Sequence, residues 1–236
     1  MGITSRITHR LAPRAVDVAP GPTSAVIHKA LHQAITGVGP LKGAAAAAEK
    51  QLAEQDGTGP EAVDAAVADV IANHVRFAGA QGFATNLGGL VTLAATVPAN
   101  LAGLALLQCR MVAAIAHLRG YDLEDPRVRN AVLACILGEG DVKKLVKGKS
   151  LPGTPRQIAT TGEHSEELDR VVAKQVTTAL VAGVAGRQVV TTIGKRIPVA
   201  GGLVGAGTDA HATWSVGKYA ARELTARPGK AAEGAA

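Results

Sequence analysis

The sequence predicts an all-α fold, a single compact domain of about eight to nine helices with tightly packed Gly- and Ala-rich faces. Apolar residues make up 47% of the 236 residues but aromatic residues only 2%, so the core must be built mainly from Ala, Val, Leu and Ile. Alanine has the best helix propensity, and the Ala-rich stretches lack the alternation of apolar and polar residues that is typical of strands. A chain of this length can bury such a core without disulfides.

The first three helices are expected in the N-terminal third. Residues 1–21 lack periodicity and are expected to form a flexible arm before a helical domain over 22–225. Apolar residues at helical spacing predict a helix from Thr23 or Ser24 to the "GVGP" at 37–40, and "AAAAAEKQLAEQ" predicts a second that ends at "DGTGP". A third is expected from Glu61 to Ala78, because its apolar stripe includes His74 and Phe77.

An uncharged stretch follows, from Phe77 to Cys109. Its length would suffice for a membrane span, but Pro98 removes a backbone donor and Asn100 places an amide near the middle of the stretch. We therefore expect a short apolar helix before Val97, a break at Pro98 and a second helix from Asn100 to about Leu118.

The C-terminal half is expected to contain three longer helices. Asp125 and Pro126 supply an N-cap and a first-turn proline for a helix that ends at the "GEG" of 138–140. Residues 141–157 are interpreted as a basic loop. Helical periodicity continues from about Glu163 to Val190, and a last helix follows the glycine-rich residues 197–207, with a disordered tail over 226–236.

Polar residues interrupt the apolar pattern at regular positions. Asn100, Arg110 and His117 fall on one face of the predicted helix that ends near Leu118, and Asp209 and His211 follow the glycine-rich stretch. One reading is a buried hydrogen-bonded seam that fixes helix register, and the other is a ligand-binding seam of all five residues. An arginine in this setting must meet a carboxylate, carbonyl groups or an anionic ligand, because an unpaired buried charge is unfavourable by several kcal/mol.

Residues 78–129, with "GGLVTLAATVPANLAGLALLQCR" and "AHLRGYDLEDPRVR", and residues 197–220, with "IPVAGGLVGAGTDAHATW", resemble the EcsC family of bacterial proteins. The family usually has Asp at the position of Asn100, and Asn is common at that of Asp209. We therefore hypothesise that these two side chains face each other, with Arg110 balancing the charge. The family's name comes from a gene beside an ABC-transporter pair, which implies a membrane connection but no reaction.

Patterns for catalysis and cofactors are weak. His28 and His32 have a zinc-compatible spacing but no further ligand nearby in the sequence. Gly148, Lys149 and Ser150 end like a phosphate loop without its first glycine. Cys109 and Cys135 are expected to be small buried hydrophobes. We therefore expect no metal, no cofactor and no catalytic residue, and the scarcity of aromatic residues argues against nucleic acid as a partner.

The densest cluster of positive charge defines an expected membrane-facing basic patch: Lys143, Lys144, Lys147, Lys149 and Arg156. We expect a non-enzymatic protein that is membrane-associated or holds a fatty-acyl or lipid-like ligand in an apolar helical interior. The alternatives are a protein that modulates an ABC transporter or another membrane complex without a small ligand, and a protein that inserts into bilayers. The expected location is the cytoplasm, including the inner face of the plasma membrane.

Overall fold

The computed structural model describes residues 20–87, 93–161, 164–193 and 198–227, and within these the side chains of 25–81, 102–161, 164–182 and 207–227. The described part contains nine helices and one short hairpin, which confirms the prediction of an all-α fold. Most of the expected N-terminal arm and C-terminal tail lies outside the described residues. The elements are α1 (Pro20–Thr36), β1 (Gly37–Val38), β2 (Leu41–Lys42), α2 (Ala44–Ala53), α3 (Pro60–Leu87), α4 (Leu93–Leu118), α5 (Pro126–Leu137), α6 (Glu139–Lys147), α7 (Pro155–Thr160), α8 (Glu166–Ile193) and α9 (Pro198–Glu223).

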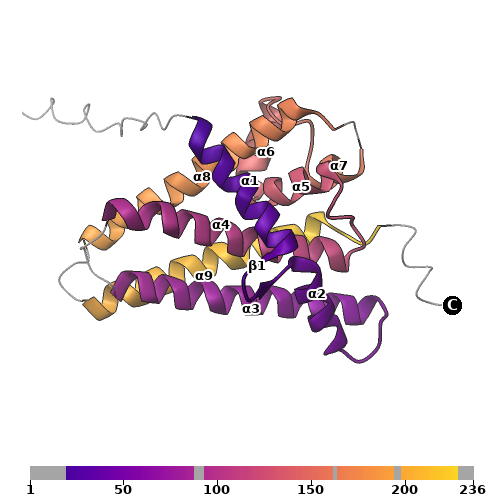
Figure 1. Cartoon of the computed structure of the whole chain (residues 1–236), viewed down its shortest axis with the longest axis horizontal. Helices are drawn as coiled ribbons and strands as arrows, with labels where there is room; N and C mark the ends of the chain where they lie inside the picture. Colours follow the sequence, from indigo (N-terminus) through magenta and orange to yellow (C-terminus); the bar gives the residue numbers. More distant parts are fainter. Residues whose placement is uncertain (1–19, 88–92, 162–163, 194–197, 228–236) are drawn as a thin grey trace, which may run out of the picture.

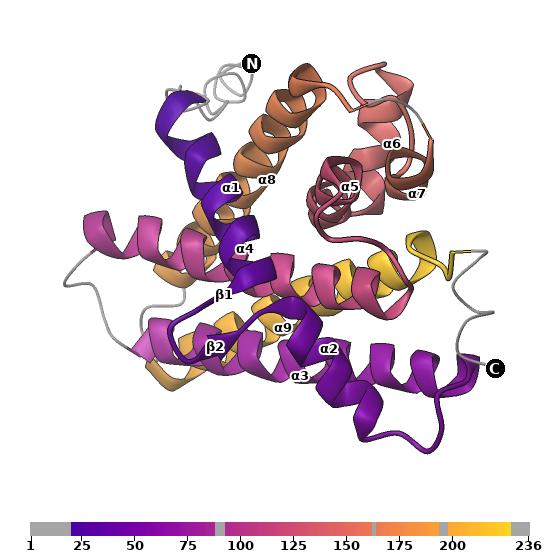
Figure 2. The same ribbon diagram turned by 45° about the vertical axis from the view of Figure 1, so that its right-hand side comes forward.

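The long helices α3, α4 and α9 run along the molecule, and α3 packs against α9 over most of its length (Figure 1). Helix α1 crosses α4, and α2 packs against both α3 and α4. The shorter helices α5, α6 and α7 gather near the start of α8, and α6 and α7 also contact the C-terminal end of α9 (Figure 2). Strands β1 and β2 pair in an antiparallel hairpin that joins α1 to α2.

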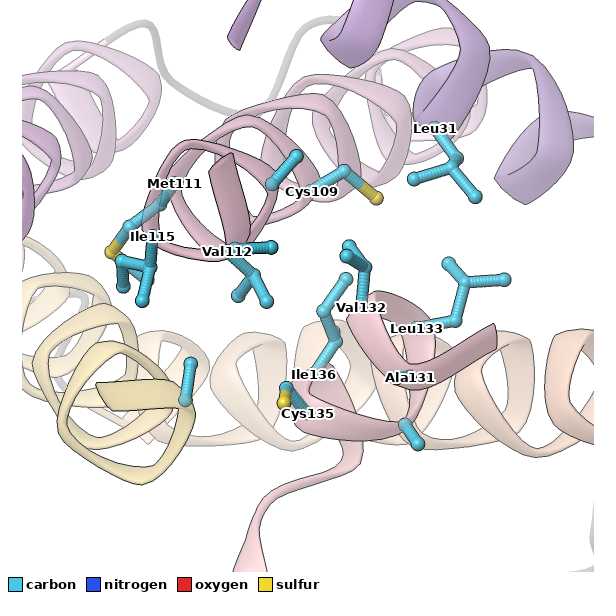
Figure 3. Close-up of a cluster of buried hydrophobic side chains, with 14 of the residues drawn as sticks. Leu31, Cys109, Met111, Val112, Ile115, Ala131, Val132, Leu133, Cys135 and Ile136 are labelled. Carbon is cyan, nitrogen blue, oxygen red and sulfur yellow. The ribbon is translucent and has the colours of Figure 1, made fainter. Parts of the chain in front are cut away.

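The core is centred on the contact between α4 and α5 (Figure 3). Val112 on α4 lies near Val132 on α5, and Leu31 of α1 lies close to both helices. Every residue from Ala131 to Leu137 is buried. Cys109 and Cys135 are buried free thiols, as predicted; burial raises the pKa of Cys109 to about 12 and that of Cys135 well above its usual value.

The predicted break at Pro98 is wrong, because α4 is continuous from Leu93 to Leu118. Pro98 lies in the second turn, where its missing N–H removes a single intrahelical hydrogen bond near the helix start. No helix among the described residues combines the length and the apolar character needed to cross a bilayer.

The interpretation of residues 141–157 as a loop is also wrong. Helix α6 places Val142 in the core, and Lys143 and Lys144 pair with Glu139 and Asp141 on the same helix, at 2.6 and 2.9 Å. Helix α7 begins with a capping box, in which Thr154 and Gln157 bond to each other's backbone N–H. Short helices of this kind are set by caps and a few buried contacts rather than by a long apolar period.

Two helix starts differ from the predicted positions. Helix α1 begins at Pro20, a few residues earlier than expected, which fits the preference of proline for the first turn. Helix α9 begins at Pro198, so the glycine-rich stretch forms its first turns instead of preceding it. The predicted N-cap of α5 is confirmed, since the Asp125 carboxylate accepts a hydrogen bond of 2.8 Å from the backbone N–H of Arg127.

Candidate functional site

Arg110 of α4 joins two parts of the chain that are far apart in the sequence. Its Nε donates to the backbone carbonyl of Lys42 in the hairpin at 2.9 Å, and its Nη1 lies 3.5 Å from Nε2 of His74 on α3. His74 is buried and its Nδ1 is 2.7 Å from the carbonyl oxygen of Val70. Because that oxygen can only accept, Nδ1 carries the proton and Nε2 is free to accept from Arg110. Of the three kinds of partner considered for Arg110, namely a carboxylate, carbonyl groups or an anionic ligand, the structure contains a carbonyl.

Burial around this contact shifts the pKa of both side chains. Burial, as the largest cause, and the nearby positive charge of Arg110 together lower the pKa of His74 to about 4, against the opposing hydrogen bond to Val70. Burial also lowers the pKa of Arg110. The imidazole is neutral at pH 7, so the pair holds the hairpin against α3 and α4 with a single positive charge.

His117, about two helical turns beyond Arg110, faces a different partner. Its Nε2 is 3.3 Å from a carboxylate oxygen of Glu49 on α2. It also lines an open cavity of about 720 Å³ that is bordered by Tyr121 and Arg227. The Arg227 guanidinium lies over the Tyr121 ring at 5.7 Å, which anchors the end of the described chain beside this cavity.

The other residues of the predicted seam lie on α9 and at the start of α4. His211 is exposed and stacks on Trp214, with ring centroids 5.9 Å apart, and Asp209, two residues before His211, is half-buried. The side chain of Asn100 lies outside the described residues, so its expected contact with Asp209 stays a prediction. Arg110 and His117 thus face the hairpin and α2, whereas His211 pairs within α9.

The residues of the predicted basic patch lie in four different settings. Lys143 and Lys144 are paired with acidic neighbours on α6, and Arg156 lies on α7, where its backbone N–H is 3.4 Å from a Glu223 carboxylate oxygen. Lys147 is exposed at the end of α6. Lys149 instead lines a cavity between α5, α7 and α8.

Sequence reasoning missed a grouping of side chains that only the fold creates. His28 and His32 share a small cavity of about 210 Å³ with His164 and Asp169 from the start of α8. Asp169 accepts a 2.6 Å hydrogen bond from the buried Asn130, and within the described chain no set of three such side chains is placed to hold a metal ion. No local pattern could reveal this cavity, since its histidines are separated by more than half of the chain.

The chain contains two long helical hairpins, α3–α4 and α8–α9. The most distinctive feature of the structure is the end of the molecule at which both helical hairpins turn. The last turns of α3 and α8 and the first turns of α4 and α9 lie together at the left of both Figure 1 and Figure 2. We call this end the hairpin pole. It combines the middle of the uncharged stretch that begins at Phe77, where α3 ends and α4 starts, with the glycine-rich start of α9.

The hairpin pole has no acidic residue. The sequence contains no Asp or Glu between Asp69 and Asp122, and none between Asp169 and Asp209. The nearest of these along a pole helix is Asp209, about three turns and about 16 Å from the start of α9. Over that depth, Arg187 on α8 is the one charged residue in the described parts of the four helices. An apolar end with positive charge alone is suited to an anionic surface.

The model of the EcsC protein family matches residues 2–228. The match includes both segments on which the resemblance was based and extends it to nearly the whole chain. No curated protein and no solved structure matches the chain.

Proposed function

We propose, from the premise that this chain belongs to the EcsC protein family, that it is a peripheral membrane protein whose hairpin pole rests on an anionic bilayer surface. The proposal does not require a bilayer-spanning segment. A protein of this kind places apolar groups about 5–10 Å into the boundary between headgroups and acyl chains and holds positive side chains at the headgroup level.

The observation that carries the proposal is the absence of carboxylates from the four helix ends that meet at the pole. A carboxylate there would be repelled by anionic headgroups, whereas each Lys or Arg near such a surface contributes about 1 kcal/mol. Arg187 on α8 supplies one such charge. Apolar burial and positive charge therefore favour the same orientation.

The predicted basic patch supports membrane contact less well than the pole does. Two of its lysines are already paired with Glu139 and Asp141, and the carboxylate of Glu139 also pairs with Arg222 at 2.6 Å. Approach of this surface to an anionic membrane would bring both acidic groups with it. The hairpin pole has no acidic side chain that anionic headgroups would repel.

A fatty-acyl ligand within the helical interior has less support. The residues at the centre of the core, such as Val112, Ile115 and Val132, are fully buried against their neighbours. The two larger cavities described above are open and have charged residues among their linings. The alternative function, modulation of an ABC transporter, is also compatible with a position at the membrane. A pull-down that recovers a stable membrane-protein partner, together with no binding to lipid vesicles, would favour this alternative over direct binding to lipid.

Vesicle flotation tests the proposal. Full-length protein is mixed with vesicles of phosphatidylcholine alone or with 30 mol% phosphatidylglycerol, about the composition at which surface charge dominates adsorption. We expect flotation with the anionic vesicles, weakened at high salt because the charges are screened. Arg187→Glu should lower the vesicle affinity by about tenfold or more, since it reverses a charge at the pole.

Arg170→Glu is the matched control, because it makes the same charge change at the opposite end of the same helix. Arg170 is exposed and pairs with Glu167 at 3.2 Å. We expect this variant to float like the wild type, with an unchanged circular dichroism spectrum for both variants. Equal loss of binding in the two variants would show a response to net charge rather than to the pole and would contradict the proposal.

A further inference from the structure

A cavity of about 730 Å³ lies between the start of α5, helix α7 and the first turns of α8. Figure 2 shows these elements at the side of the molecule away from the hairpin pole. The size is within the usual range of small-molecule sites. This cavity is separate from the proposed membrane surface, so the inference below goes beyond the proposed function.

The cavity carries uncompensated positive charge. Arg127 at its edge is held by Asp125 through a 2.7 Å ion pair, and Glu167 is held by Arg170 at 3.2 Å. These two lining groups are therefore neutralised by partners. Lys149 and Lys174 also line the cavity, and neither ammonium group has a carboxylate within ion-pair distance in the part of the chain that the structure describes.

Lys149 has a backbone conformation that does not favour lysine. It follows the C-cap of α6 with a φ of 57°, the one non-glycine residue in the left-handed region among those described. The N–H groups of Lys149 and Ser150 bond to the carbonyls of Val146 and Leu145 at 3.0 and 2.8 Å. This is a Schellman motif, in which glycine is usual at the position of Lys149. Helix termination therefore does not explain a lysine here.

The rest of the lining suits an anion with an apolar body. Ser150 and Ser165 also line the cavity, and a hydroxyl group can donate a hydrogen bond to an oxygen atom, whereas the hydroxyl of Thr161 already donates to the Gln157 carbonyl at 2.7 Å. Ile158, Leu168 and Val171 supply the apolar wall. Two ammonium groups match the charge of a phosphate dianion more closely than that of a single carboxylate.

We propose that this cavity binds a phosphate monoester with an apolar body, with Lys149 and Lys174 as its phosphate ligands. The same chemistry is offered by a soluble phosphate ester and by the headgroup of a phosphatidic acid. The charged end would lie between the two lysines, and the apolar part would lie against the wall formed by α7 and α8.

Calorimetric titration of the full-length protein tests the proposal with three probes: phenyl phosphate, inorganic phosphate and dihexanoyl phosphatidic acid. We expect phenyl phosphate to bind more tightly than inorganic phosphate, because it also contacts the apolar wall. Tighter binding of the phosphatidic acid than of phenyl phosphate would assign the site to a lipid headgroup, and the reverse would assign it to a soluble ester. No binding of either ester would overturn the proposal.

Lys149→Gly separates ligand binding from folding. Glycine is favoured in this conformation, so we expect a melting temperature equal to or above that of the wild type together with about a tenfold loss of phenyl phosphate affinity, the effect of removing one charge-assisted hydrogen bond. Lys174→Ala should lower the affinity similarly. Unchanged affinity in both variants would overturn the assignment of the two lysines.

Arg187→Glu is the control that separates this proposal from the membrane proposal. Arg187 lies at the hairpin pole and outside the cavity, so we expect phenyl phosphate to bind that variant as it binds the wild type. Failure of vesicle flotation would leave the phosphate measurement unaffected, and failure of phosphate binding would leave the flotation result unaffected.

Discussion

Protonation of a single buried residue, His74, couples the fold to pH. Its pKa of about 4 lies below the value of about 6.5 expected in the unfolded chain. The unfolded state therefore takes up a proton more readily than the folded state as the pH falls. The contribution of His74 to stability is complete above pH 6.5, decreases as the pH falls from 6.5 to 4, and does not change further below that.

We predict that wild-type protein loses about 2 kcal/mol more unfolding free energy than a His74→Leu variant when the pH is lowered from 8 to 5, because only the wild type must keep this imidazole neutral. Denaturant titrations of both proteins at the two pH values measure the difference. The comparison cancels the contributions of the other histidines. Parallel pH dependence in the two proteins would show that His74 is protonated as easily in the folded state as in the unfolded state.

The sequence indicated a buried position for His74 and a need for a partner at Arg110, but not the contact between them. His74 was placed on an apolar stripe, and Arg110 was expected to need a carbonyl or acidic partner. The carbonyl comes from Lys42, which lies 68 positions earlier. Periodicity reports which face of a helix is buried, whereas the identity of a distant partner depends on how the helices pack.

At the scale of the element, glycine determines how closely α9 approaches its neighbours. A Cβ atom at Gly217 would lie 2.9 Å from Cγ1 of Ile71 on α3 and 3.1 Å from Sδ of Met111 on α4. Gly207 lies on the same helix, and a Cβ there would meet no atom within 4 Å. Both glycines therefore lie within the same helix, but a side chain would find open space at Gly207 and closely packed atoms at Gly217.

This contrast gives a prediction for α9. Gly207→Ala should raise the unfolding free energy by about 0.5–1 kcal/mol, since alanine is the better helix former. Gly217→Ala gains the same propensity but must displace Ile71 and Met111, and overpacking typically costs about 1–3 kcal/mol. We expect a net loss of about 1 kcal/mol for Gly217→Ala, measured by denaturant titration. Equal stabilisation by both substitutions would mean that α9 can move away from α3 and α4 at little cost.

Helices with a long apolar period or a clear N-cap were predicted well, and the short helices α6 and α7 were not. The stripes in α1, α3 and α8 and the N-cap of α5 identified these helices. Helix α6 was missed because its lysines suggested a solvated loop, although Val142, Leu145 and Val146 have helical spacing. The continuous path of α4 through Pro98 was missed because a proline rule was applied without knowing that the helix begins only one turn earlier.

At the scale of the whole molecule, the chain separates its charges. Acidic residues occur throughout the end that contains α2, α6 and the start of α8, and they are absent from the helix ends that meet at the hairpin pole. The sequence showed each uncharged or acid-free segment separately. The sequence could not show that the helical hairpins α3–α4 and α8–α9 turn at the same end of the molecule, because that depends on how the four helices lie side by side. The candidate membrane surface is therefore a property of the fold.

If the pole meets the membrane, the long helices stand steeply on the surface, and depth along them can be measured with tryptophan. The chain has a single tryptophan, Trp214, which is 48% exposed and lies about 24 Å along α9 from its start. Phe83 lies about 6 Å from the end of α3. A penetration of about 5–10 Å reaches position 83 but not position 214.

We predict that acyl-chain-brominated phosphatidylglycerol quenches the emission of a Phe83→Trp, Trp214→Phe variant and leaves that of the wild type nearly unchanged. Stronger quenching of Trp214 would instead place the exposed side of α9 flat on the bilayer.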